Sequence, residues 1–170
     1  IGSFLRRIGA FQFNPKLIQK PCDNKFDTRL DYDGNNLASV LYTLQNEYPD
    51  NFSALITDMR SFDRSLSQIF SPQMGFEQIG IGIREIGKKG YFTGAQLSDG
   101  ILVFLSYVTL KHLPEHQDIM FFEEPESYVH PHKLENILKI IRDLHTINPS
   151  VQTFITTHSP YLLDCVKEFP

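Results

Sequence analysis

The sequence predicts an α/β fold in which a helical middle segment and a β-hairpin are followed by a C-terminal βαβ unit with a parallel sheet. Three observations carry this prediction. Apolar residues recur at helical spacing from residue 36 to residue 59, and isoleucines alternate with glycines before a glycine-rich turn at residues 87–90. The last third of the chain alternates short apolar runs with one amphipathic helix, the pattern of a parallel βαβ unit.

The N-terminal part is expected to pass from irregular structure into two helices. Residues 1–33 have short apolar groups broken by prolines, so we expect short strands and loops there. A helix follows Asn36, where Asn35 or Asn36 can cap the first turn, and a second helix follows Pro49. The apolar positions are Leu37, Val40, Leu41 and Leu44 in the first helix, Phe52, Leu55, Ile56 and Met59 in the second, and then a looser set of Leu66, Ile69 and Phe70.

A β-hairpin is expected over residues 79–95, with its turn at the sequence GKKG. The stretch GIREIGKK, residues 82–89, matches the phosphate-loop pattern G-x-x-x-x-G-K-[ST] except at Lys89, where the pattern requires a hydroxyl for magnesium. Aromatic and β-branched residues follow the turn, and they favour a strand over the helix that a phosphate loop precedes. This near match therefore predicts a hairpin and not a nucleotide site.

A buried helix is expected after Gly100. The run ILVFLSYVTL is apolar nearly all round, as in a helix buried on most sides, and it is too short for the ~20 residues of a membrane span. Directly before it stands LSDG, in which Ser98 suits an N-cap and Gly100 lets a ligand approach the backbone. The free N–H groups of the first turn attract anions, so this helix start is either a phosphate site or an ordinary cap.

The βαβ unit carries polar groups at both strand ends. The first strand, residues 119–122, runs into Glu123 and Glu124, and the second, residues 151–156, leads to His158. Because parallel strands meet at the same edge of the sheet, we expect these side chains to lie close together. One carboxylate can hold magnesium, the next can deprotonate a water, and an imidazole can donate to a terminal phosphate.

Composition restricts the function classes. With 170 residues and 41% apolar content, the chain is one domain's length with a sizeable core. The net charge of -4 argues against coating nucleic acid through bulk charge, and the local basic run of Arg6, Arg7, Lys16 and Lys20 is expected to be solvated surface. The two cysteines are too few for a disulfide framework, so we expect a reducing, cytoplasmic setting. Because the longest apolar stretch is too short for a membrane span, we expect no membrane partner.

Three ordered motifs resemble those of ABC-type ATPases within the P-loop AAA family. LSDG before a helix is similar to the signature motif, IMFFEEPESYVHP to the Walker B plus D-loop segment, and FITTHSPYLLD to the switch-histidine segment. They look most like the RecF, SMC and OLD branch, whose ATPases handle DNA or serve in bacterial defence. The stretch DGNNLASVL, residues 33–41, also resembles the opening of the helical subdomain in that branch.

The resemblance implies roles for individual residues. It places Mg²⁺ at Glu123 and the catalytic carboxylate at Glu124, and it matches His158 to the switch histidine. The family's D-loop corresponds to Pro125, Glu126 and Ser127, and its signature to Ser98, Asp99 and Gly100, residues that contact ATP bound mainly to the other subunit. The implied assembly is a head-to-head dimer joined by ATP. Three positions depart from the common pattern, namely Glu123 in place of Asp, Asp99 in place of Gly and Ile101 in place of Gln.

The resemblance also implies a domain layout. We expect residues 1–170 to form a single partial ATPase domain, with a helical signature subdomain at 34–112, including the hairpin, and a Walker B and switch-histidine core at 113–170. Since no Walker A precedes these motifs, the sequence is expected to be the C-terminal half of the domain and to hydrolyse ATP only when joined to a Walker A half, on a preceding segment or another chain.

Two alternatives remain open at this point. The same fold can hold a partner without catalysis, and Glu123, Glu124, Glu126 and His158 can serve a metal-dependent nuclease. His130 and His132, together with Glu126, also suggest a metal cluster. However, Pro131 between the histidines fits an early position of the next helix, so we expect them to shape the start of that helix. DNA is a candidate partner under the ATPase hypothesis and under the nuclease hypothesis.

Overall fold

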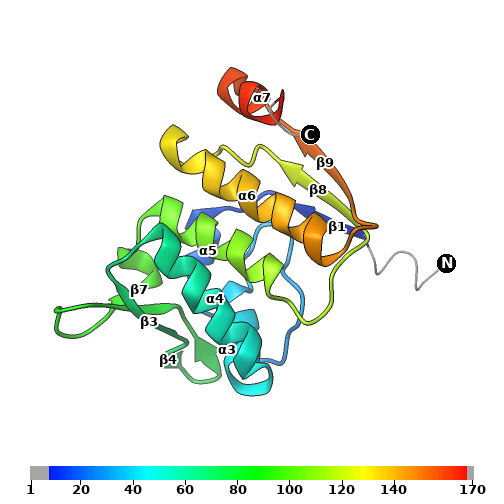
Figure 1. Ribbon diagram of the computed structural model, residues 1–170. Coiled ribbons are helices and arrows are strands. Elements are labelled where there is room, and N and C mark those ends of the chain that lie inside the picture. The colour runs from blue at the N-terminus through cyan, green and yellow to red at the C-terminus, as the bar shows by residue number, and fades with distance from the viewer. Residues whose placement is uncertain (1–7, 168–170) are drawn as a thin grey trace.

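The computed structural model describes residues 8–167, and a parallel three-stranded sheet lies along one side of the helices (Figure 1). The strand order is β1 (Ile8–Phe11), β8 (Ile119–Glu123), β9 (Gln152–Thr156), with all neighbours parallel. Helix α6 (Pro131–Ile147) connects β8 to β9, and α7 (Pro160–Lys167) follows β9. The predicted βαβ unit is therefore confirmed, and the N-terminal strand β1 extends its sheet.

One face of this sheet packs on the helices and the other does not. Phe11, Met120 and Phe122 point into the core and are each about 1% exposed. On the opposite face, Phe121 and Phe154 stack with ring centroids 4.9 Å apart and stay largely exposed. The strands therefore alternate buried and exposed side chains, as half-buried strands do.

The helical part packs around α5 (Asp99–Lys111), whose residues 102–110 are all buried. It contacts α6, α4 (Pro49–Phe62) and the short α2 (Pro15–Ile18), while α3 (Leu37–Glu47) packs on α4. The near-complete apolar run predicted this helix correctly, since only a helix covered on most sides can bury it. The apolar stripes of α3 and α4 are also confirmed.

Charged residues join three of these helices at their polar edges. Lys111 Nζ lies 2.9 Å from Asp58 Oδ2 and 2.7 Å from Asp143 Oδ2, so the ammonium bridges α4 and α6. Asp58 Oδ2 also lies 2.8 Å from His112 Nε2. Burial would raise the pKa of Asp58, but the hydrogen bonds from Lys111 and His112 outweigh it and lower that pKa.

Two small antiparallel sheets lie at the far side of the helices from β9 (Figure 1). One contains β2 (Cys22–Asp23), β5 (Gln78–Ile79) and β4 (Gln73–Gly75), and the other contains β3 (Leu66–Phe70), β6 (Gly82–Glu85) and β7 (Phe92–Thr93). The 3₁₀ turn η1 (Gly94–Gln96) then leads to α5.

The predicted hairpin is right in its turn and wrong in its first strand. Strands β6 and β7 pair antiparallel, and the turn glycines Gly87 and Gly90 have φ of 76° and 82°, which only glycine adopts readily. However, the chain changes sheets between β5 and β6, so residues 79–85 are two strands. No helix follows the turn, as predicted, and the phosphate-loop near match is a hairpin.

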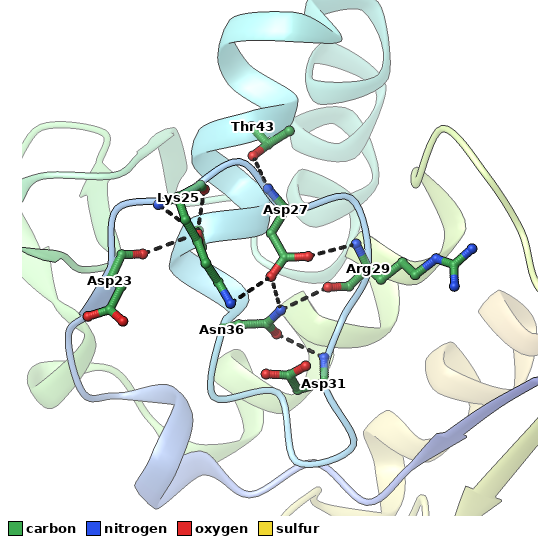
Figure 2. Close-up of polar contacts among 8 residues, drawn as sticks. Asp23, Lys25, Asp27, Arg29, Asp31, Asn36 and Thr43 are labelled. Carbon is green, nitrogen blue, oxygen red and sulfur yellow. Dashed lines mark hydrogen bonds and ion pairs between the residues drawn. The ribbon is translucent and has the colours of Figure 1, made fainter. Parts of the chain in front are cut away.

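Asn36 is the N-cap residue of α3, one of the two positions predicted, but its side chain makes no capping hydrogen bond. It is 2% exposed and bonds instead to the preceding loop, as Figure 2 shows. Its Nδ2 donates to Asp27 Oδ2 at 2.7 Å and to the Arg29 carbonyl at 2.8 Å, while its Oδ1 accepts from the Asp31 amide at 2.9 Å. These three hydrogen bonds from one buried side chain hold residues 27–31 against α3.

The remaining predictions for the N-terminal part have mixed outcomes. Residues 8–33 do form short strands, a short helix and loops. Lys16 and Lys20 are exposed, whereas Arg6 and Arg7 lie outside the described residues. Across residues 8–167, no helix combines the length and the apolar character that crossing a membrane requires.

Candidate functional site

The tips of β8 and β9 bring the acid pair and the histidine together. Glu123 is paired with Thr156 in the sheet register, and the Glu124 amide donates to the Thr156 carbonyl at 2.9 Å. Past these residues the two loops stay adjacent, and His158 Nε2 lies 3.8 Å from Glu124 Oε1. The His158 side chain is 92% exposed, so its ring is open to a ligand.

Glu124 is held in an uncommon backbone conformation. Its φ is 45°, in the left-handed region that residues with a Cβ avoid at a cost of roughly 1–2 kcal/mol. Ser127 closes the turn, because its amide donates to the Glu124 carbonyl at 2.8 Å and its hydroxyl to Glu124 Oε2 at 3.1 Å. Backbone strain of this kind persists where surrounding contacts enforce it, and it concentrates at functional sites.

Glu126 connects the two strand tips within the chain. Its Oε1 accepts from the Thr157 hydroxyl at 2.5 Å and from the His158 amide at 3.2 Å. Its Oε2 is buried and has no hydrogen-bond partner among the described residues. The carboxylate of Glu126 thus fixes the loop that carries His158.

Glu123 contacts a residue that no motif indicated. Its Oε2 lies 2.9 Å from the hydroxyl of Tyr32, which also lies 2.9 Å from Gln12 Oε1. Gln12 follows β1, the parallel neighbour of β8, and Tyr32 comes directly after residues 27–31, which Asn36 holds. Partial burial, with the hydrogen bond and charge of Glu123, raises the pKa of Tyr32.

A pocket of about 340 Å³ opens between the end of β1 and the turn after β8. Its polar lining contains two carboxylates, those of Asp33 and Glu124, and no lysine or arginine. The remaining lining residues are Gln12, Phe13, Asn14, Leu17, Tyr32, Ser127 and Tyr128. The two carboxylates favour a cation or water in the pocket beside Glu124.

The signature-like residues start α5 next to this turn. Ser98 accepts a hydrogen bond from the Ile101 amide at 3.3 Å, which confirms it as the N-cap. Asp99 Oδ1 lies 3.5 Å from Lys16 Nζ, so its carboxylate has a partner. A Cβ on Gly100 would lie 3.5 Å from the Tyr128 carbonyl, an ordinary contact, so the chain's own packing does not require glycine there.

Among the described residues, no three histidine, cysteine or carboxylate side chains gather as a metal-holding group. His130 caps α6, its Nδ1 accepting a hydrogen bond from the His132 amide at 3.4 Å, in line with Pro131 at the helix start. The oxygen donors at the β8 tip do fit Mg²⁺, which typically takes one or two carboxylates and completes its shell with water and phosphate oxygens.

The parallel sheet, with acids at its strand tips and helices beside it, is consistent with a P-loop NTPase-like domain of the AAA class. A family comparison agrees with this class: residues 13–164 match the model of the family described as "AAA domain, putative AbiEii toxin, Type IV TA system". The match covers nearly the whole chain, and the chain belongs to this family. Families of this class in general bind nucleotide and use ATP with Mg²⁺.

Sequence reasoning missed Tyr32, Gln12 and the orienting bonds of Ser127 and Glu126. A signal existed for Gln12, since a polar residue following a short apolar run is the pattern used for Glu123. Tyr32 left no comparable signal, because it reaches Glu123 from a loop 91 residues away in the sequence.

Proposed function

We propose that this chain is the ATP-binding and hydrolysing module of an ABC-type ATPase of the RecF/SMC/OLD-like branch. It turns over ATP when a Walker A segment joins these residues, and it acts in the cytoplasm, in DNA maintenance or bacterial anti-phage defence. The order of the signature, Walker B and switch-histidine motifs supports this proposal. The observation that carries it is the 3.8 Å approach of Glu124 to His158 across neighbouring strand tips.

Each residue has a distinct role in this mechanism. Glu124, oriented by Ser127, accepts the proton of the attacking water as general base. His158 presents an open imidazole beside it to donate to the terminal phosphate. Glu123 would hold Mg²⁺, and the bound cation would supply charge neutralisation for the transferred phosphoryl group. Glu126 and Ser127 fix the D-loop between these groups.

The signature residues face a second subunit in this proposal. The first turn of α5 offers free N–H groups, and Ser98 and Gly100 are positioned to meet a phosphate of ATP bound mainly to the partner. Gly100 supports this role, because the surroundings within the chain leave room for a Cβ. The expected assembly is a head-to-head dimer with ATP at its interface, and DNA is a candidate substrate.

The test compares ATP turnover by wild type, Glu124→Gln and a matched control, Glu47→Gln, an exposed acid at the end of α3. Each is assayed alone and joined to a Walker A segment. Removing a general base lowers the rate by 10² to 10⁴-fold, so we expect about 100-fold or more loss for Glu124→Gln with nucleotide binding retained. The control should stay within about twofold of wild type.

The outcomes separate the hypotheses. Turnover that appears only with the Walker A segment and is lost in Glu124→Gln supports the ATPase. If the joined wild type binds ATP but never hydrolyses it, the chain is a non-catalytic partner-binding module. Equal rates in Glu124→Gln and wild type would exclude Glu124 as the base.

A further inference from the structure

The Tyr32 hydroxyl lies between two acceptors and carries a single proton. Glu123 Oε2 and Gln12 Oε1 are both 2.9 Å from it. A carboxylate is the stronger acceptor, so the proton belongs on the bond to Glu123. The Gln12 amide, whose oxygen and nitrogen exchange by a simple flip, then turns its N–H to the phenol oxygen. The three groups form one chain of donors that ends on the Glu123 carboxylate.

The loop that carries Tyr32 is fixed from both sides. The backbone N–H of Gln12 donates to the Tyr32 backbone carbonyl at 2.8 Å, and the backbone N–H of Asn14 donates to the Asp33 carbonyl at 3.0 Å. On the other side, the buried Asn36 bonds Asp27, Arg29 and Asp31, the residues leading to Tyr32 (Figure 2). Because its backbone is fixed on both sides, the fold itself places the Tyr32 phenol against Glu123.

We propose that Tyr32 is a positioning residue that fixes the Glu123 carboxylate for Mg²⁺. The phenol donates to Oε2, which leaves Oε1 as the carboxylate oxygen that would be available to the cation. Hydrogen-bond partners of this kind orient a metal-ligating carboxylate, and their removal typically costs 10- to 100-fold in metal affinity. The inference rests on the proposed function only in assigning the metal to Glu123.

The first experiment measures binding of Mn²⁺ alone to the chain by electron paramagnetic resonance. Tyr32→Phe removes one hydroxyl and keeps the ring. Tyr42→Phe is the control, because Tyr42 is similarly exposed, at 37% against 44% for Tyr32, and among the described residues the Tyr42 hydroxyl makes no hydrogen bond. Because Tyr32 is partly solvated, we expect its loss to weaken Mn²⁺ binding roughly 3- to 30-fold. Glu123→Gln should abolish this binding, and Tyr42→Phe should leave it unchanged.

The second experiment measures the Mg²⁺ concentration for half-maximal ATPase activity after joining to a Walker A segment. Tyr32→Phe should raise this concentration by a similar factor, while the rate recovers at saturating Mg²⁺. A purely structural role would lower the melting temperature without moving the Mg²⁺ dependence.

The results distinguish the inference from the proposed function. If the joined protein has no ATPase activity but Tyr32→Phe still weakens Mn²⁺ binding, the positioning role stands and the proposed function fails. If wild type binds no Mn²⁺, or if Tyr32→Phe binds it as tightly as wild type does, the positioning role is overturned. An unchanged Mg²⁺ dependence in an active enzyme overturns it equally.

Discussion

Replacing Asn36 with alanine should destabilise the fold through the loop it holds. The side chain is 2% exposed and makes three hydrogen bonds, one of them to the Asp27 carboxylate. Neutral hydrogen bonds contribute about 1 kcal/mol each, and a bond to a charged group about 1.5–3 kcal/mol, which sums to roughly 3.5–5 kcal/mol. Water can reach the partly exposed Asp27 and the exposed Asp31 in the variant, so we expect a loss of about 2–3 kcal/mol.

The assay is urea unfolding of Asn36→Ala beside Asn35→Ala. Asn35 is the exposed neighbour, and changes at such positions usually stay within about 0.5 kcal/mol. The free energy of unfolding should therefore drop by at least about 1.5 kcal/mol more in Asn36→Ala than in the control. A difference below about 1 kcal/mol would refute the reasoning, because the loop would then hold its place without this side chain.

Two further predictions concern Gly100 and His112. Gly100→Ala should leave the melting temperature equal or higher, because the new Cβ meets only the Tyr128 carbonyl at 3.5 Å. The same variant should weaken ATP-dependent dimerisation, measured by light scattering. A lower melting temperature would contradict this reasoning. Burial lowers the pKa of His112 despite its contact with Asp58, so below pH 6.5 the unfolded chain takes up a proton before the folded chain does, and stability should fall as the pH drops. His112→Gln should reduce the loss of unfolding free energy between pH 7.5 and pH 5.5, leaving the part due to His116, whose pKa burial also lowers; an equally steep loss would contradict it.

The sequence predicted most of the fold because its elements follow local rules. The stripes of α3 and α4 and the apolar run of α5 bury the residues that their spacing indicates. The approach of Glu124 and His158 was also predictable, since parallel strands end at the same edge. Their chemical roles remain predictions.

What escaped prediction depends on long-range or irregular contacts. Leu66 and Ile69 are both buried although three residues apart, because a register shift in β3 breaks the strict alternation of a strand. The change of sheet between β5 and β6 is set by their partners in β2 and β3. Asn36 stands at the predicted N-cap position, but its side chain bonds to the loop and not to the first turn, which tertiary packing decides.

The left-handed conformation of Glu124 has a consequence for protein engineering. A computational or directed search for thermostable variants would select glycine or asparagine at this position, since both tolerate positive φ. Such a variant would have a higher melting temperature and, under the proposed mechanism, would no longer hydrolyse ATP. Screens on this scaffold therefore need to score turnover beside heat resistance, because at this one residue the two qualities are selected in opposite directions.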